Sequence, residues 1–291
     1  MIAARPGVDA AARVGALVDR LAAAYLEHTH PRAMLLVGSA ASGEVDGYSD
    51  VDLLLYYDAV PTASMLAAAR GLVGAERFVG TDWPGEGYSE RYEVDGIHCQ
   101  LGHVLIDAWE REIAKVIEEL DLDAPLVKQL MGLAEGRPLH GEELIAAWRR
   151  RAEYTPRLQR GMVEKHWRFF PWWYYEEKLL RRDATIWRYE VLVQSAYNLV
   201  GVLAALNRIY FSTFEFKRVR SYLAGFEVTP PDLADRLEAL FTADARDATV
   251  ELERLVDETR ALVASRFPDL DLTIEWGGNP TPPGSREQPW T

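Results

Sequence analysis

Residues 34–57 read MLLVGSAASGEVDGYSDVDLLLYY, and this stretch decides the fold of the N-terminal half. The first four residues, Met34–Val37, are all apolar, which predicts a buried strand. A polar, glycine-bearing segment follows at 38–49, and a second apolar run covers Val51–Tyr57. The sequence therefore predicts a strand, a loop and a second strand in direct succession.

Two carboxylates stand where the second strand begins. Asp50 and Asp52 are two residues apart, and such side chains on a strand point to the same side, roughly 6.6 Å apart. Carboxylates at this separation repel each other unless a cation lies between them. Hard oxygen ligands on a rigid strand suit Mg²⁺, with the oxygens of a nucleoside triphosphate filling the remaining positions.

The end of the first strand offers a place for those phosphates. Gly38 carries no Cβ, so phosphates can approach the backbone closely there. Ser39 adds a hydroxyl and a backbone N–H as donors. Together the two residues predict a phosphate-binding turn beside the carboxylate pair.

The combined pattern resembles the signature of the DNA-polymerase-β-type nucleotidyltransferase superfamily. It consists of Gly38-Ser39, ten intervening residues and Asp50-Val51-Asp52. The intervening residues agree with the motif through Ala41, Gly43, Gly47, Tyr48 and Ser49. The resemblance implies an α+β fold with a small mixed sheet, a Mg²⁺ held by Asp50 and Asp52, and an NTP, most simply ATP, bound by Gly38, Ser39 and Ser49.

In that superfamily a neighbouring strand usually supplies a third carboxylate, and Gln100 stands at the matching place. Glutamine can bind a cation through its carbonyl oxygen, but it adds no charge and cannot take a proton. We therefore expect Gln100 to be a neutral third ligand. Glu93 and Asp95 are alternatives if the register is shifted by a bulge, and His98 shares the face of Gln100, although a lone strand histidine is more often structural.

Around this centre, hydrophobic periodicity predicts further elements. An amphipathic helix is expected over Val8–His28 and another over Pro61–Val73. The Gly- and Pro-bearing stretch Gly80–Gly87 predicts a loop. From Tyr92 to Leu105 the pattern returns to β, with Gly96 as a bend.

Beyond Trp109 nearly all of the chain to Phe267 has helical composition, which predicts a helical bundle. The expected helices are Trp109–Leu120, Glu142–Arg151, Val163–Arg182, Thr185–Ile209, Thr213–Leu223 and Pro231–Phe267, the last broken near Asp244. We expect a nucleotidyltransferase domain over 1–125, a helical domain on the acceptor side over 126–276, and a Pro-rich tail over 277–291.

The helical half has a less specific resemblance to kanamycin nucleotidyltransferase and related antibiotic-modifying enzymes. The apolar stretch Val191–Phe211, followed by a basic segment containing Lys217, carries it. The resemblance implies a glutamate as general base, for which Glu177 is the candidate, and Lys217 as a phosphate ligand. A solvated helix face with pairing of Glu177 and Arg181 is the structural alternative.

Composition limits the partners. The formal charge of −13 over 291 residues disfavours duplex nucleic acid and favours a small or cationic acceptor, such as an aminoglycoside-like hydroxyl compound.

The single cysteine, Cys99, excludes an intrachain disulfide. Neither an N-terminal signal nor a stretch of about 18 apolar residues is evident, so we expect a cytoplasmic protein that does not enter a membrane. The oligomeric state, including a homodimer, is left open.

Three other patterns have weaker support. Arg160 and His166 match the loose Arg-x4–6-His pattern of HEPN ribonucleases. The aromatic segment 167–175 could stack a ring but more often forms core. Two further Asp-x-Asp triplets, at 121–123 and 269–271, lie in polar segments where solvated caps explain them.

Two alternatives to transfer onto a small molecule remain for the predicted site. One is transfer to RNA or protein, as in toxin–antitoxin systems, and the other is nucleotide binding without catalysis.

Overall fold

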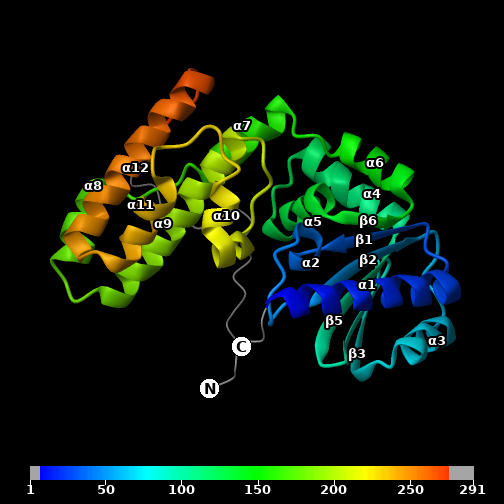
Figure 1. Cartoon of the computed structure of the whole chain (residues 1–291). Coiled ribbons are helices and arrows are strands. Elements are labelled where there is room, and N and C mark those ends of the chain that lie inside the picture. Colours follow the sequence, from blue (N-terminus) through cyan, green and yellow to red (C-terminus); the bar gives the residue numbers. More distant parts are fainter. Residues whose placement is uncertain (1–6, 275–291) are drawn as a thin grey trace. The chain divides into compact units, whose positions relative to one another are not determined.

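The computed structural model describes residues 7–274, which form two compact units (Figure 1). The first unit comprises the chain up to Glu119 together with Gln129–Glu153. The second comprises Leu120–Lys128 and the chain from Tyr154 onward. The chain passes between the units after Glu119, after Lys128 within helix α5 (Ala124–Glu135), and after Glu153. Segment 129–153, which the sequence assigned to the helical domain, is grouped with the first unit.

A six-stranded mixed sheet organises the first unit, in the order β3-β4-β5-β2-β1-β6. The strands are β1 (Ala33–Val37), β2 (Val51–Tyr57), β3 (Glu76–Trp83), β4 (Gly87–Val94), β5 (Ile97–Leu105) and β6 (Arg137–His140). Strand β2 is antiparallel to β1 and parallel to β5. Strand β4 is antiparallel to both β3 and β5. The sheet together with the helical second unit confirms the predicted α+β class.

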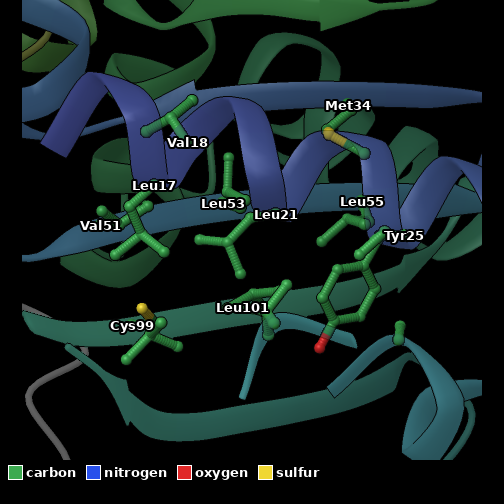
Figure 2. Close-up of a cluster of buried hydrophobic side chains, with 14 of the residues drawn as sticks. Leu17, Val18, Leu21, Tyr25, Met34, Val51, Leu53, Leu55, Cys99 and Leu101 are labelled. Carbon is green, nitrogen blue, oxygen red and sulfur yellow. The ribbon is translucent and has the colours of Figure 1, made fainter. Parts of the chain in front are cut away.

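Helices cover both faces of the sheet. Helix α1 (Gly7–Thr29) lies along one face with α3 (Ala63–Val73), and Figure 2 shows its apolar side chains directed at those of β2 and β5. On the other face Tyr56 packs against Trp109 of α4 (Ile106–Ala114) and Trp148 of α6 (Glu142–Arg151). A π-helical turn, η1 (Lys115–Glu119), follows α4. The strands that carry the site are thus fixed by a closed core.

Two strands of this sheet were not predicted. The stretch Gly80–Gly87, expected to be a loop, contains the end of β3, and Gly80 is accommodated there because the ring of Tyr88 fills the space of a side chain. Strand β6 lies in a region expected to be helical and pairs with β1. Its four residues take strand form because the edge of β1 offers backbone partners.

The second unit consists of helices. They are α7 (Pro156–His166), α8 (Trp172–Tyr174), η2 (Tyr175–Leu180, π), α9 (Thr185–Leu206), η3 (Thr213–Arg218, 3-10), α10 (Val219–Leu223), α11 (Leu233–Thr242) and α12 (Ala245–Arg266). The predicted break near Asp244 is confirmed, because this residue caps α12 through bonds from the backbone N–H groups of Arg246 and Asp247. The predicted helix Val163–Arg182 is wrong, because the chain leaves helical form after His166 and restarts after Pro171.

Helix α9 has the length and composition to cross a membrane. The expectation that no stretch meets this criterion is therefore wrong. Of its most apolar window, 72% is buried inside the protein. A core helix of a helical domain has this composition, because its neighbours surround it with other apolar side chains.

Candidate nucleotide and metal site

Three neighbouring strands bring the predicted site residues together. Val37, the last residue of β1, pairs with Asp52 on β2, and Asp52 pairs with Gln100 on β5. Gly38 follows β1 directly, so the turn it begins lies beside Asp52. The register puts Gln100 on the next strand opposite Asp52, and its part as a third metal ligand stays a prediction.

Gly38 is in close contact with the Asp52 carboxylate. Its backbone has φ 69° and ψ −158°, a combination essentially limited to glycine. A Cβ at this position would lie 2.8 Å from Asp52 Oδ2. Only glycine therefore lets the turn pass beside Asp52 without displacing its carboxylate.

The turn after Gly38 presents polar groups. Ser39 begins the one-turn helix α2 (Ser39–Ser42), whose Ala41 and Ser42 N–H groups donate to the Gly38 carbonyl. Within residues 7–274 the backbone N–H groups of Ser39 and Ala40 have no backbone acceptor. Phosphate binding by this turn stays a prediction.

Ser49 has a structural part in the loop before Asp50. Its hydroxyl donates to Asp46 Oδ1 at 3.1 Å and accepts from the Asp46 N–H at 2.9 Å. The Asp46 carboxylate also accepts from the Tyr48 N–H at 2.9 Å. These bonds hold the loop in a tight turn that leads into Asp50. Nucleotide binding by Ser49 stays a prediction.

Gln100 contacts the carboxylate pair directly. Its Nε2 donates a hydrogen bond of 3.0 Å to Asp50 Oδ2, which orients that carboxylate. On the opposite face of β5, burial and the charges of Asp52 and Asp50 raise the pKa of Cys99 to about 12. The thiol therefore stays protonated, and the charge of the site comes from the two aspartates.

Both alternative third acids are paired with arginines. Glu93, on the face of Gln100, is paired with Arg77 at 2.9 Å and lies 3.5 Å from His98 Nδ1. Asp95 lies in the β4–β5 turn, where it pairs with Arg20 of α1 at 2.7 Å. The predicted bend at Gly96 is confirmed, with φ 75°. Gln100, by contrast, is hydrogen-bonded to one of the aspartates.

The residues present fit a divalent cation that arrives with a nucleotide. Within residues 7–274, no three His, Cys, Asp or Glu side chains are grouped to hold a metal ion. Two carboxylates supply hard oxygen ligands, and Mg²⁺ usually binds through one or two carboxylates plus substrate phosphates. The space left by the missing Cβ of Gly38 lies directly beside one of them.

Glu177 and Lys217 both belong to the second unit. Glu177 lies in η2 and its carboxylate is 3.6 Å from Lys178 Nζ, whereas Arg181 pairs with Glu176 at 3.2 Å. The suggested pair of Glu177 with Arg181 is therefore replaced by Glu176 with Arg181. Lys217 is exposed in η3, with its Nζ 5.1 Å from the ring centre of Phe214.

The ribonuclease pattern does not form a site. His166 is only 1% exposed and packs against the rings of Tyr197 and Phe211. Arg160 is occupied by Glu164 and Asp269. A buried imidazole and a surface guanidinium with two acidic partners cannot act together on RNA.

The remaining motifs are structural. Asp121 accepts from the Asp123 N–H, and Asp271 accepts from Thr273, so both other Asp-x-Asp triplets form local turns. In the aromatic segment Phe169, Phe170 and Tyr175 are buried. Both outcomes agree with the structural interpretation of these patterns.

Arg91 is a candidate that the sequence did not reveal. It pairs with Gln100 across β4 and β5 and is exposed on the same face. Its place in a strand of alternating polar and apolar residues indicates an exposed side chain. Only the register shows that this side chain lies in the row of Asp52.

Comparisons with known proteins give matches among solved structures alone. No family model matches the chain, and no curated protein matches it. Among solved structures, it is similar to a nucleotidyltransferase-like protein from Exiguobacterium sibiricum 255-15, with 11% identity and a TM-score of 0.34, over 85% of this chain and 78% of that chain. At this TM-score the likeness carries no argument about function. The function is therefore argued from the geometry of the site.

Proposed function

We propose that the protein is a Mg²⁺-dependent nucleotidyltransferase that moves a nucleoside monophosphate from an NTP, most simply ATP, to a hydroxyl of a small molecule. The observation that carries this is the contact of the Gly38 turn with Asp52. It combines a glycine-only backbone, adjacent donors and a carboxylate pair. A strand pair with no ligand has no need of that combination.

Each residue has a distinct part in the proposal. Asp50 and Asp52 hold the cation, and Gln100 orients Asp50. The turn at Gly38 and Ser39 binds the phosphates through backbone and hydroxyl donors. With Mg²⁺ held by Asp50 and Asp52, the phosphate charge would be neutralised and attack on phosphorus favoured.

The reaction is an in-line displacement. The acceptor hydroxyl oxygen forms a bond to the α-phosphorus, the bond from that phosphorus to the bridging oxygen breaks, and pyrophosphate leaves with the electron pair. The hydroxyl proton goes to a general base. Positioning and charge neutralisation supply most of the rate.

The test is substitution of the carboxylates. Asp50→Asn and Asp52→Asn should each abolish Mg²⁺-dependent binding of ATP, measured by calorimetry, without changing the circular dichroism spectrum. Asp121→Asn is the matched control, because it alters the first aspartate of a triplet with the same spacing outside the site. Equal ATP binding by all three variants and the wild type would contradict the proposal.

Gln100 favours a second candidate, a nucleotide-binding protein without turnover. Glutamine in place of a third carboxylate adds no charge at the site and cannot accept a proton. The two candidates separate when α-labelled ATP is incubated with aminoglycosides, phosphorylated sugars and total RNA. Binding by calorimetry with no labelled acceptor in this panel would favour the binding protein, whereas label on any acceptor establishes transfer.

A further inference from the structure

One face of the sheet carries the whole site. Along β2, β5 and β4, alternate side chains point away from α1. The register puts Asp52, Gln100 and Arg91 in one row across these three strands. The next residue in the row, Val79 on β3, is 51% exposed, so the row ends in an open shelf.

Arg91 is an unused cation on this shelf. Among residues 7–274, the guanidinium of Arg91 has no hydrogen bond or ion pair to a side chain or to a backbone group. The nearest acid on the same face of its strand, Glu93, is paired with Arg77 and lies beside His98. Neighbouring strands are about 4.8 Å apart, so the backbone of Arg91 lies about 10 Å from that of Asp52. An arginine side chain reaches most of that distance.

The in-line reaction fixes which reactant lies above Arg91. The pyrophosphate must leave on the side where the phosphates are bound, and the Gly38 turn follows β1. The acceptor must then approach from the opposite side of Asp52. In the sheet order this side is β5 and then β4, where Gln100 and Arg91 are exposed.

We infer that the acceptor is a small hydroxyl compound that carries a carboxylate or phosphate group, and that Arg91 binds this group. A guanidinium binds either anion through two parallel hydrogen bonds. The inference rests on the proposed function and narrows it. A cationic acceptor of the aminoglycoside kind would be repelled by Arg91, although the net charge of the chain favours it.

Binding in the presence of a nucleotide analogue tests the inference. The protein is first saturated with Mg²⁺ and α,β-methylene-ATP, and then titrated by calorimetry with glycerol 3-phosphate, glycerol or kanamycin. Only glycerol 3-phosphate should bind. Arg91→Gln should weaken this binding by about tenfold or more, because a charged hydrogen-bond partner is lost. Arg111→Gln on α4 is the control, because Arg111 is also exposed but lies beyond the other end of β5.

The outcomes separate the inference from the function beneath it. If the analogue itself does not bind, the proposed function fails, and the inference fails with it. If the analogue binds but glycerol 3-phosphate binds only to protein without the analogue, Arg91 contacts the triphosphate and the inference is overturned. Equal binding in Arg91→Gln, absence of glycerol 3-phosphate binding, or binding of kanamycin instead also overturns it. Arg91-dependent transfer of label to total RNA alone would exclude the small acceptor.

Discussion

Gln100 Nε2 donates a hydrogen bond of 3.0 Å to Asp50 Oδ2 across the parallel strands β5 and β2. This bond holds one predicted metal ligand in place, so Gln100→Ala should weaken binding of Mg²⁺·ATP. The expected loss is about 1 kcal/mol, about fivefold, as for other hydrogen bonds to a charged group near solvent. Calorimetric titration of both proteins measures it.

Replacing the same residue by an acid reverses the effect. In Gln100→Glu a third carboxylate stands beside Asp50, so repulsion should lower the melting temperature of the metal-free protein. Added Mg²⁺ should restore it and bind more tightly than to the wild type. If Gln100→Glu responded to Mg²⁺ as Gln100→Ala does, position 100 would not face the cation.

Gly38→Ala should remove nucleotide binding along with some stability. The backbone at φ 69° and ψ −158° disfavours any Cβ, at about 1–3 kcal/mol, and the added methyl would meet Asp52 Oδ2. Gly43→Ala is the matched control, because φ is 79° there but the Cβ would lie in open space. Both variants should melt earlier than wild type in thermal denaturation, and only Gly38→Ala should lose ATP binding. Loss in both would mean that backbone strain alone disturbs the site.

The sequence was sufficient for the centre of the first unit because local rules act there. Strands β1 and β2 follow from uninterrupted apolar runs, and Gly38 and Asp52 follow from turn chemistry and side-chain alternation. Their mutual contact then needs only that the two strands pair. For this reason the two strands and the turn between them lie where the sequence predicts them. The binding roles of Gly38, Asp50 and Asp52 stay predictions.

Non-local contacts explain what the sequence did not show. Strand β6 is defined by the free edge of β1, and Gly80 is part of β3 because Tyr88 packs over it. The residues around Arg91 in the sequence form no motif. Only its pairing with Gln100 places it near the candidate site. Each of these depends on a register between segments distant in the chain, which periodicity within one segment cannot supply.

Glu90→Gln should destabilise the first unit strongly. The carboxylate is fully buried and accepts bonds from Tyr25, Arg70 and His103. Neutralising it leaves the Arg70 charge partly buried without its partner, which costs about 3–5 kcal/mol in comparable cases. Glu93→Gln on the same strand, whose partner Arg77 is exposed, should cost about 1 kcal/mol or less. Urea unfolding of each variant measures the difference, and equal losses would contradict the special role of Glu90.

The same residue predicts acid sensitivity. Burial alone would raise the pKa of Glu90, but the bonds from His103 and Tyr25 and the charge of Arg70 outweigh it and lower the pKa below 4.5. The folded state therefore binds its proton less readily than the unfolded state. The stabilisation by Glu90 is present above pH 4.5 and is lost as the pH falls through the lower value of the folded state. In Glu90→Gln, unfolding measured across this range should lose that part of its pH dependence.

His166 should make the second unit sensitive to mild acid. Burial lowers its pKa from 6.5 to about 3, with further contributions from Lys165 and Arg168. The folded state therefore takes up this proton only at a lower pH than the unfolded state. The stabilisation is complete above pH 6.5 and is lost as the pH falls toward 3, by about 3 kcal/mol at pH 4.5.

Hydrogen exchange measures this effect within the second unit. The amides of α7, which ends at His166, and of α9, which packs against it through Tyr197, report the opening free energy of wild type and His166→Leu at pH 7 and pH 4.5. Wild type should lose about 3 kcal/mol more than the variant between these pH values. Every other group titrates in both proteins and cancels from the comparison. An equal loss in the two proteins would show that the imidazole is already accessible to protons in the folded state, against its burial beside Tyr197 and Phe211.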